Sequence, residues 1–75
     1  MANLQKRSFT LAGHATSVAV EPEFWAVLSE MAAEQSLGLA ALVTRLDQSR
    51  RDRPLASACR LAALDWTRSR KDARP

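Results

Sequence analysis

Cysteine and histidine are almost missing from this chain of 75 residues, which has one of each, Cys59 and His14. One cysteine excludes an internal disulfide framework, and one cysteine with one histidine is too few for a structural zinc site. We therefore expect no metal and no cofactor. A chain this short buries little surface, so without such cross-links it is expected to gain stability by pairing with a second copy.

Long apolar runs are missing too. No segment approaches the roughly 18 consecutive apolar residues of a transmembrane helix. A signal peptide has an apolar stretch after its basic residues, and the opening MANLQKRSFT has none. With a free thiol, these features predict no membrane partner and a cytoplasmic location. The sequence also offers no pair of carboxylates, no nucleophile with a base and no glycine-rich phosphate loop, so we predict that the protein is not an enzyme.

Charge is unevenly distributed along the chain, whose formal net charge is +3. Residues 1–20 carry +2, residues 21–47 carry −4 and residues 48–75 carry +5. Two basic ends on an acidic middle permit a nucleic-acid partner, although a solvated basic tail fits the same charges.

Residues 7–21 alternate with a period of two, which predicts β structure. The parity of the apolar positions changes at Gly13 and His14, which a two-residue type II′ turn with glycine first would explain. The expected pairs on the buried face of this hairpin are Phe9 with Val18 and Leu11 with Thr16. One long strand with a bulge at Gly13 is the alternative. The opposite face carries small side chains, namely Ser8, Thr10, Ala15, Ser17 and Ala19.

Three helices are predicted after the strands, because apolar residues recur there at helical spacing. Proline suits a first helical turn, so Pro22 begins the first helix and Pro54 the third, while Leu37 and Gly38 mark the break before the second. The expected ranges are 22–36, 39–50 and 54–70. We expect a single domain over residues 6–70 and a frayed basic tail over residues 71–75.

A short strand that ends at a proline, followed by two helices and a short turn, resembles the ribbon-helix-helix superfamily of the Arc and methionine repressors. The string KRSFTLAGHATSVAVEPEFW, then LAALVTRLD and a third helix like LASACRLAALDW, is similar to an uncharacterised bacterial branch of that superfamily. The resemblance covers about residues 6–70. It implies an α+β, mostly helical fold with an N-terminal strand or hairpin, an extra C-terminal helix and an intertwined homodimer.

The resemblance also implies where DNA would bind. In the family, the exposed face of the ribbon enters the major groove, and the start of the second helix binds a phosphate. The expected DNA-binding residues are Lys6, Arg7, Thr10, Ala15, Ser17, Ala19, Gly38, Leu39 and Ala40. The expected dimer core is Val18, Val20, Phe24, Leu28, Met31, Leu42 and Leu46, and a monomer is expected to have almost no core of its own.

Three functional hypotheses follow. The leading one is a homodimeric DNA-binding protein that acts as a small transcriptional regulator. Ala15 and Ala19 cannot hydrogen-bond to base edges, which motivates the second: a protein-interaction or antitoxin-like module on the same dimer scaffold, without sequence-specific DNA binding. The third is a higher oligomer formed through the last helix.

Overall fold

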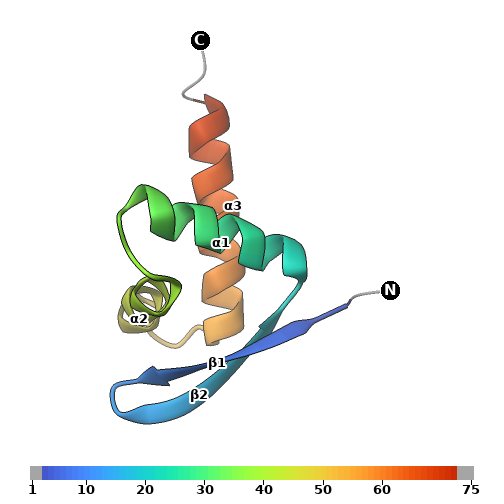
Figure 1. Cartoon of the computed structure of the whole chain (residues 1–75). Helices are drawn as coiled ribbons and strands as arrows, with labels where there is room; N and C mark the ends of the chain where they lie inside the picture. The colour runs from blue at the N-terminus through green and yellow to red at the C-terminus, as the bar shows by residue number, and fades with distance from the viewer. Residues whose placement is uncertain (1–2, 73–75) are drawn as a thin grey trace.

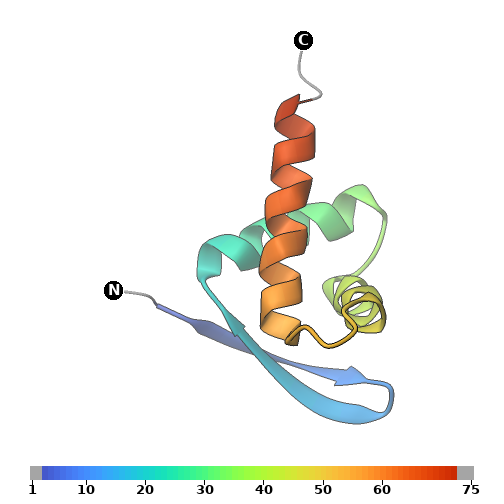
Figure 2. The same ribbon diagram turned by 180° about the vertical axis from the view of Figure 1, so that it is seen from behind.

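A β-hairpin and three helices make up the chain. The computed structural model describes the backbone of residues 3–72 and the side chains of residues 3–70. The elements are β1 (Gln5–Leu11), β2 (His14–Val20), α1 (Pro22–Glu34), α2 (Leu39–Ser49) and α3 (Leu55–Asp72), and the hairpin lies beneath the helices (Figure 1). Helix α1 crosses in front of α3 in this view and behind it in the reverse view (Figure 2). The predicted α+β fold with an extra C-terminal helix is confirmed.

The hairpin itself is confirmed, but its predicted register is wrong. Strands β1 and β2 pair antiparallel, which excludes the single bulged strand. The turn lies at Ala12 and Gly13, whose φ angles of 51° and 81° fit a type I′ turn, the form that matches the right-handed twist of paired strands. Phe9 therefore pairs with Thr16, and Leu11 pairs with His14. Because this register differs from the predicted one by an even number of residues, every side chain keeps its predicted face.

Helix α1 begins at Pro22, as predicted, and ends at Glu34, slightly before the predicted end. The N–H groups of Ser36 and Leu37 bond back to carbonyls of the last turn at 3.0 and 2.8 Å. This is a Schellman motif, with Ser36 in the left-handed region at φ 59°. The motif turns the chain sharply, so that α2 leaves at 98° to α1.

The later helix boundaries shift by one or two residues. Helix α2 ends at Ser49, and α3 begins at Leu55, directly after the proline that signals its start. Helix α3 continues through Asp72, two residues beyond its predicted end, and the predicted fraying of the tail from residue 71 stays a prediction. The rest of that tail, residues 73–75, lies outside the described residues. Over the described part, no helix alone is long and apolar enough to span a membrane, although α1 and α2 taken together reach that length and composition.

A single chain encloses an apolar core, which corrects the expectation that a monomer has almost none. Buried side chains come from every element: Leu11, Val18, Val20, Trp25, Leu28, Met31, Ala32, Leu42, Val43, Cys59 and Ala63. Of the residues predicted as dimer core, Phe24 and Leu46 are half-buried against this cluster and the others belong to it. Strand β1 and helix α3 help to enclose the core, to which they contribute Leu11, Cys59 and Ala63. Contact of these residues with a second copy stays a prediction.

Trp25 ties α1 to β1. Its side chain is only 2% exposed, its indole N–H donates a hydrogen bond to the carbonyl of Gln5 (2.7 Å), and its ring centroid lies 5.9 Å from that of Phe9. The helical pattern places Trp25 at the edge of the apolar stripe of α1. It is central in the structure because the hairpin folds back over that side of the helix.

Two ion pairs connect α3 to the two ends of α1. Arg60 donates to Glu21 (2.9 Å), and this hydrogen bond lowers the pKa of the Glu21 carboxyl. Farther along, Glu34 accepts a hydrogen bond from the indole of Trp66 (3.2 Å) and pairs with Arg70. The guanidinium of Arg70 also lies 4.7 Å from the Trp66 ring centroid. These contacts supplement the apolar packing between α3 and α1.

Candidate functional site

The outer face of the hairpin, meaning the side chains that point away from the helices, is small and mostly polar. It consists of Lys6, Ser8 and Thr10 from β1 and Ala15, Ser17 and Ala19 from β2. All are exposed except Ala19, which is half-buried. The hydroxyls of Ser8 and Ser17 lie opposite each other, 3.3 Å apart. The structure thus brings together most of the side chains predicted to face DNA.

The outer edge of β2 has backbone groups without a strand partner in the described chain. In a hairpin with a two-residue turn, the pair that flanks the turn is hydrogen-bonded, and bonded pairs then alternate along the strands. The flanking pair here is Leu11 and His14. The N–H and C=O groups of Ala15, Ser17 and Ala19 therefore point away from β1. Proline and charged side chains commonly prevent an edge strand from pairing with another chain, and β2 has no proline, lysine or carboxylate.

The start of α2 forms the second predicted region. Gly38 is its N-cap, with φ −73° and ψ 159° and no side-chain cap. Gly38 and Ala40 are exposed, and Leu39 is half-buried. The first N–H groups of a helix have no partner within the helix, and the helix dipole makes this end positive. This end of α2 can therefore accept an anion such as a phosphate.

Replacing Gly38 with serine is expected to stabilise the protein by a few tenths of a kcal/mol, because serine caps a helix better than glycine. A Cβ at Gly38 meets no atom within 4 Å, and the φ of this residue suits any side chain. Thermal unfolding followed by circular dichroism measures the effect. The matched control is Gly13→Ser, which is expected to destabilise the protein because Gly13 has a φ of +81°. Equal effects of the two changes would contradict this explanation.

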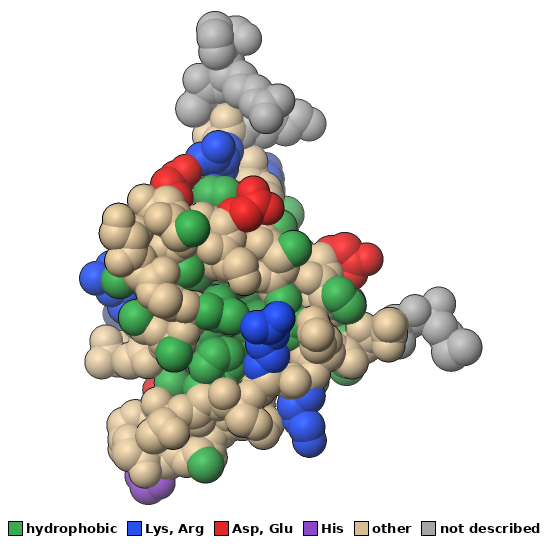
Figure 3. Space-filling view, viewed as in Figure 1, with side chains coloured by type: hydrophobic (Ala, Val, Ile, Leu, Met, Phe, Trp, Pro, Cys, Tyr) green, Lys and Arg blue, Asp and Glu red, His purple; other side chains and the backbone are tan. Residues whose placement is uncertain are grey.

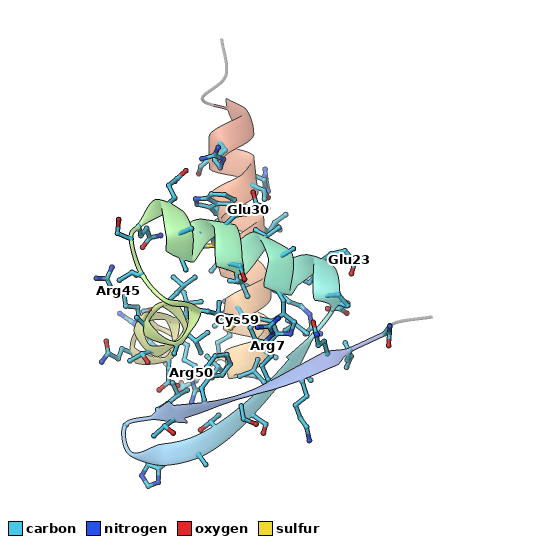
Figure 4. All side chains as sticks on the ribbon, viewed as in Figure 1. Arg7, Glu23, Glu30, Arg45, Arg50 and Cys59 are labelled. Carbon is cyan, nitrogen blue, oxygen red and sulfur yellow. The ribbon has the colours of Figure 1, made fainter. Side chains whose placement is uncertain are left out.

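Arg7 does not lie on the outer face. It pairs with Val18 on the side of the hairpin that faces the helices, and its guanidinium lies 5.4 Å from the ring centroid of Trp25. Figure 4 shows Arg7 beside β1, where the strand passes beneath α1. Lys6, the other basic residue predicted to flank DNA, lies on the outer face opposite Ala19. The two neighbours therefore present their charges on opposite sides of the hairpin.

Hydrophobic side chains also reach the surface between α1, α2 and β1 (Figure 3). Phe9 from β1, Val27 from α1 and Leu39 from α2 are half-buried against the core. An apolar surface that several elements share is typical of a contact with another polypeptide.

Acidic side chains are separated from the outer face. Glu23 and Glu30 lie along α1, above the hairpin in Figure 4. Glu21 stands just after β2, but its charge is paired with Arg60 at 2.9 Å. The outer face therefore has Lys6 as its charged side chain and no carboxylate.

The described residues offer neither a metal site nor a reactive thiol. No group of three or more His, Cys, Asp or Glu side chains in that part of the chain could hold a metal ion. Cys59 is fully buried, and burial raises the pKa of its thiol, which disfavours the reactive thiolate.

Two features of the surface are not predictable from the sequence pattern. The contact between Arg7 and Trp25 depends on the hairpin folding over α1, and a groove beside α3 depends on how α2 meets that helix. The only signal in the sequence for the second feature is the basic connector Arg50–Arg51–Asp52–Arg53.

Known proteins share this architecture. Residues 4–67 match the ribbon-helix-helix domain family. A solved structure of an uncharacterized protein from Bordetella pertussis Tohama I is similar, with a TM-score of 0.83 and 33% sequence identity. The match covers 97% of this chain and 62% of that one, so this chain spans less than two thirds of the longer protein. No curated protein matches the chain.

Proposed function

The chain belongs to the ribbon-helix-helix family, and we propose that it is a homodimeric DNA-binding protein that acts as a small transcriptional regulator in the cytoplasm. The observation that carries the proposal is the outer face of the hairpin, which has small side chains, one lysine and no carboxylate, and whose second strand leads directly into α1. A two-stranded ribbon with such a face fits the major groove of DNA.

The proposed dimer forms through the outer edges of two β2 strands. Antiparallel pairing would satisfy the backbone groups of Ala15, Ser17 and Ala19 in both copies. It would also place the two hairpins in one four-stranded sheet, with the β2 strands in the centre and the β1 strands outside.

The width of this sheet determines which strands would contact the bases and which the phosphates. Four strands at a spacing of about 4.8 Å span roughly 14 Å, and the major groove is about 12 Å wide. The central β2 strands would therefore face the bases, with Ser17 as their hydrogen-bonding side chain. The outer β1 strands would lie over the phosphates, where Lys6 can reach them. We assign the flanking phosphate contact to Lys6 and the second phosphate contact to the start of α2, because Arg7 faces the helices.

Replacing Lys6 with alanine is expected to weaken binding to all DNA sequences alike, by about tenfold near 0.1 M salt. The physical reason is the release of counterions: each phosphate contact contributes about 0.9 to the slope of log K against log [salt], and a dimer has two copies of Lys6. The slope is therefore expected to fall by nearly two. Gel shifts of genomic fragments over a series of salt concentrations measure both quantities.

Arg45→Ala is the control for this experiment, because Arg45 is exposed on α2 and lies away from the hairpin (Figure 4). Lys6→Arg should restore the slope. An unchanged slope for Lys6→Ala would contradict the phosphate contact. No salt-sensitive retardation of any fragment by micromolar protein would contradict DNA binding itself.

A protein-interaction module on the same scaffold is the second candidate. The observation that favours it is the presence of Ala15 and Ala19 on the outer face, because these residues allow close approach of a backbone but cannot hydrogen-bond to bases. Affinity purification from the native host separates the two functions. A stoichiometric protein without nucleic acid supports this candidate, and DNA fragments without such a protein support the regulator.

A further inference from the structure

A groove of about 400 Å³ lies beside α3, and none of its lining residues belongs to the proposed DNA site. It is bounded by the end of α2, which is the opposite end of that helix from the proposed phosphate contact, by the connector before α3 and by the first half of α3. Leu46, Ala58 and Leu61 supply apolar lining, and Arg50, Arg51 and Arg53 supply basic lining, against which Asp65 is the one carboxylate. The groove therefore combines an apolar surface with positive charge.

Two of the three arginines have no acidic partner among the described side chains. Arg50 is held in place, since its guanidinium donates to Asp47 (2.7 Å) and to the carbonyl of Arg53 (2.8 Å). Arg53 reaches only the hydroxyl of Ser57 (3.5 Å), and Arg51 pairs with no carboxylate within residues 3–70. The connector thus presents two positive charges that a ligand can neutralise.

The apolar lining continues onto the exposed side of α3. Leu61 is 38% exposed, and Leu64, on the next turn, is 46% exposed. Helix α3 lies on the side of the molecule shown in Figure 2, whereas the apolar surface between α1, α2 and β1 faces the viewer in Figure 3, which has the orientation of Figure 1. The groove and this apolar surface therefore lie on different sides of the molecule.

We propose that this groove binds an acidic, amphipathic segment of a partner protein. Leucine-like side chains of that segment would pack on Leu46 and Leu61, and its carboxylates would pair with Arg51 and Arg53. Arginine is suited to this role because its planar guanidinium can bind a carboxylate through two hydrogen bonds. A nucleic-acid backbone would satisfy the arginines but offers nothing to the apolar lining, so the combination favours a polypeptide. This site does not depend on the proposed DNA binding.

The experiment is an NMR titration of the full-length protein, labelled with nitrogen-15, with a synthetic helical peptide that has leucine on one face and glutamate elsewhere. Two control peptides carry lysine in place of glutamate or serine in place of leucine. Saturable shifts confined to the amides of residues 46–65 are expected for the first peptide only. Shifts spread over the hairpin, equal binding of either control peptide or no shift at millimolar peptide would overturn the proposal.

Variants of the protein test which side chains are responsible. The double substitution Arg51→Glu with Arg53→Glu is expected to weaken peptide binding at least about tenfold, since both charges are reversed. Arg45→Glu is the matched control on α2 outside the groove, and its affinity should stay within about twofold. Leu61→Ser, which keeps both arginines, should also weaken binding. Equal affinities of these variants, or displacement of the peptide by duplex DNA at the same amides, would contradict a polypeptide site.

Discussion

Replacing Trp25 with alanine is expected to lower the free energy of unfolding by about 3–5 kcal/mol, the range measured for large aromatic side chains truncated in protein cores. Trp25 is almost fully buried, and its loss leaves a cavity between α1 and β1. The carbonyl of Gln5 also loses the donor at 2.7 Å, and Phe9 loses its aromatic neighbour. Urea denaturation followed by circular dichroism, at one fixed protein concentration, measures the change.

The matched control for Trp25→Ala is Leu64→Ala on the exposed side of α3. Leu64 is 46% exposed, so its truncation is expected to change the free energy of unfolding by no more than about 0.5 kcal/mol. If both changes cost about the same, the hairpin does not fold back onto α1 as the structure has it. The contrast between the two variants therefore tests the packing of one chain, whatever its oligomeric state.

The substitution Ser17→Pro is expected to weaken the dimer by about two orders of magnitude and to abolish DNA binding with it. The N–H of Ser17 points away from β1, so proline at this position removes no hydrogen bond of the hairpin. It removes a donor from each of two β2 edges and places a ring where the partner strand would lie. At about 1 kcal/mol for each lost hydrogen bond, the bonds alone account for more than a tenfold weakening, and the steric clash adds the rest.

Ser8→Pro is the control for this substitution. Ser8 pairs directly with Ser17, so both variants lose the contact between the two hydroxyls, and both place proline on an outer edge of the same hairpin. Only the edge differs: Ser8 faces outward on β1, at the margin of the proposed sheet. Light scattering after gel filtration should find a dimer for Ser8→Pro and a monomer for Ser17→Pro at micromolar concentration. Dimers for both variants would exclude the β2 edge as the interface.

Much of the fold is predictable because a few residues carry strong local signals. Gly13 interrupts a period of two and so indicates a hairpin, while Pro22 and Pro54 lie where the first and third helices start. The exact turn was not predictable, because glycine suits either central position of a two-residue turn and both choices keep the same residues inside. Ser36 follows α1 in a left-handed conformation that favours glycine. Because serine gives no such signal, the sequence pattern predicts a helix end two residues too late.

The sequence predicts the candidate site only where the alternation of side chains along a strand decides which face of the hairpin a residue lies on. The period of two assigns Thr10, Ala15 and Ser17 to one face, and the structure places them there. The same pattern contains nothing that places Arg7 over Trp25, because that contact depends on the angle between the hairpin and α1. The groove beside α3 depends likewise on tertiary packing. Contacts between elements distant in sequence therefore account for the features that the sequence pattern did not predict.

Self-association links the fold to the proposed function, because one chain offers DNA only Lys6 and the start of α2. Two copies related by a twofold axis would double both contacts and match a symmetric DNA site. One chain already has an apolar core of its own, so the mass of the folded species is the direct test of the dimer.

Sedimentation equilibrium of the unaltered protein, over a concentration series from about 1 to 100 µM, tests this claim most directly. The account predicts a mass twice that of the 8.3 kDa chain at the upper concentrations and dissociation only on dilution. A folded species with the mass of one chain throughout the series, still able to bind DNA in a salt-dependent manner, would contradict it.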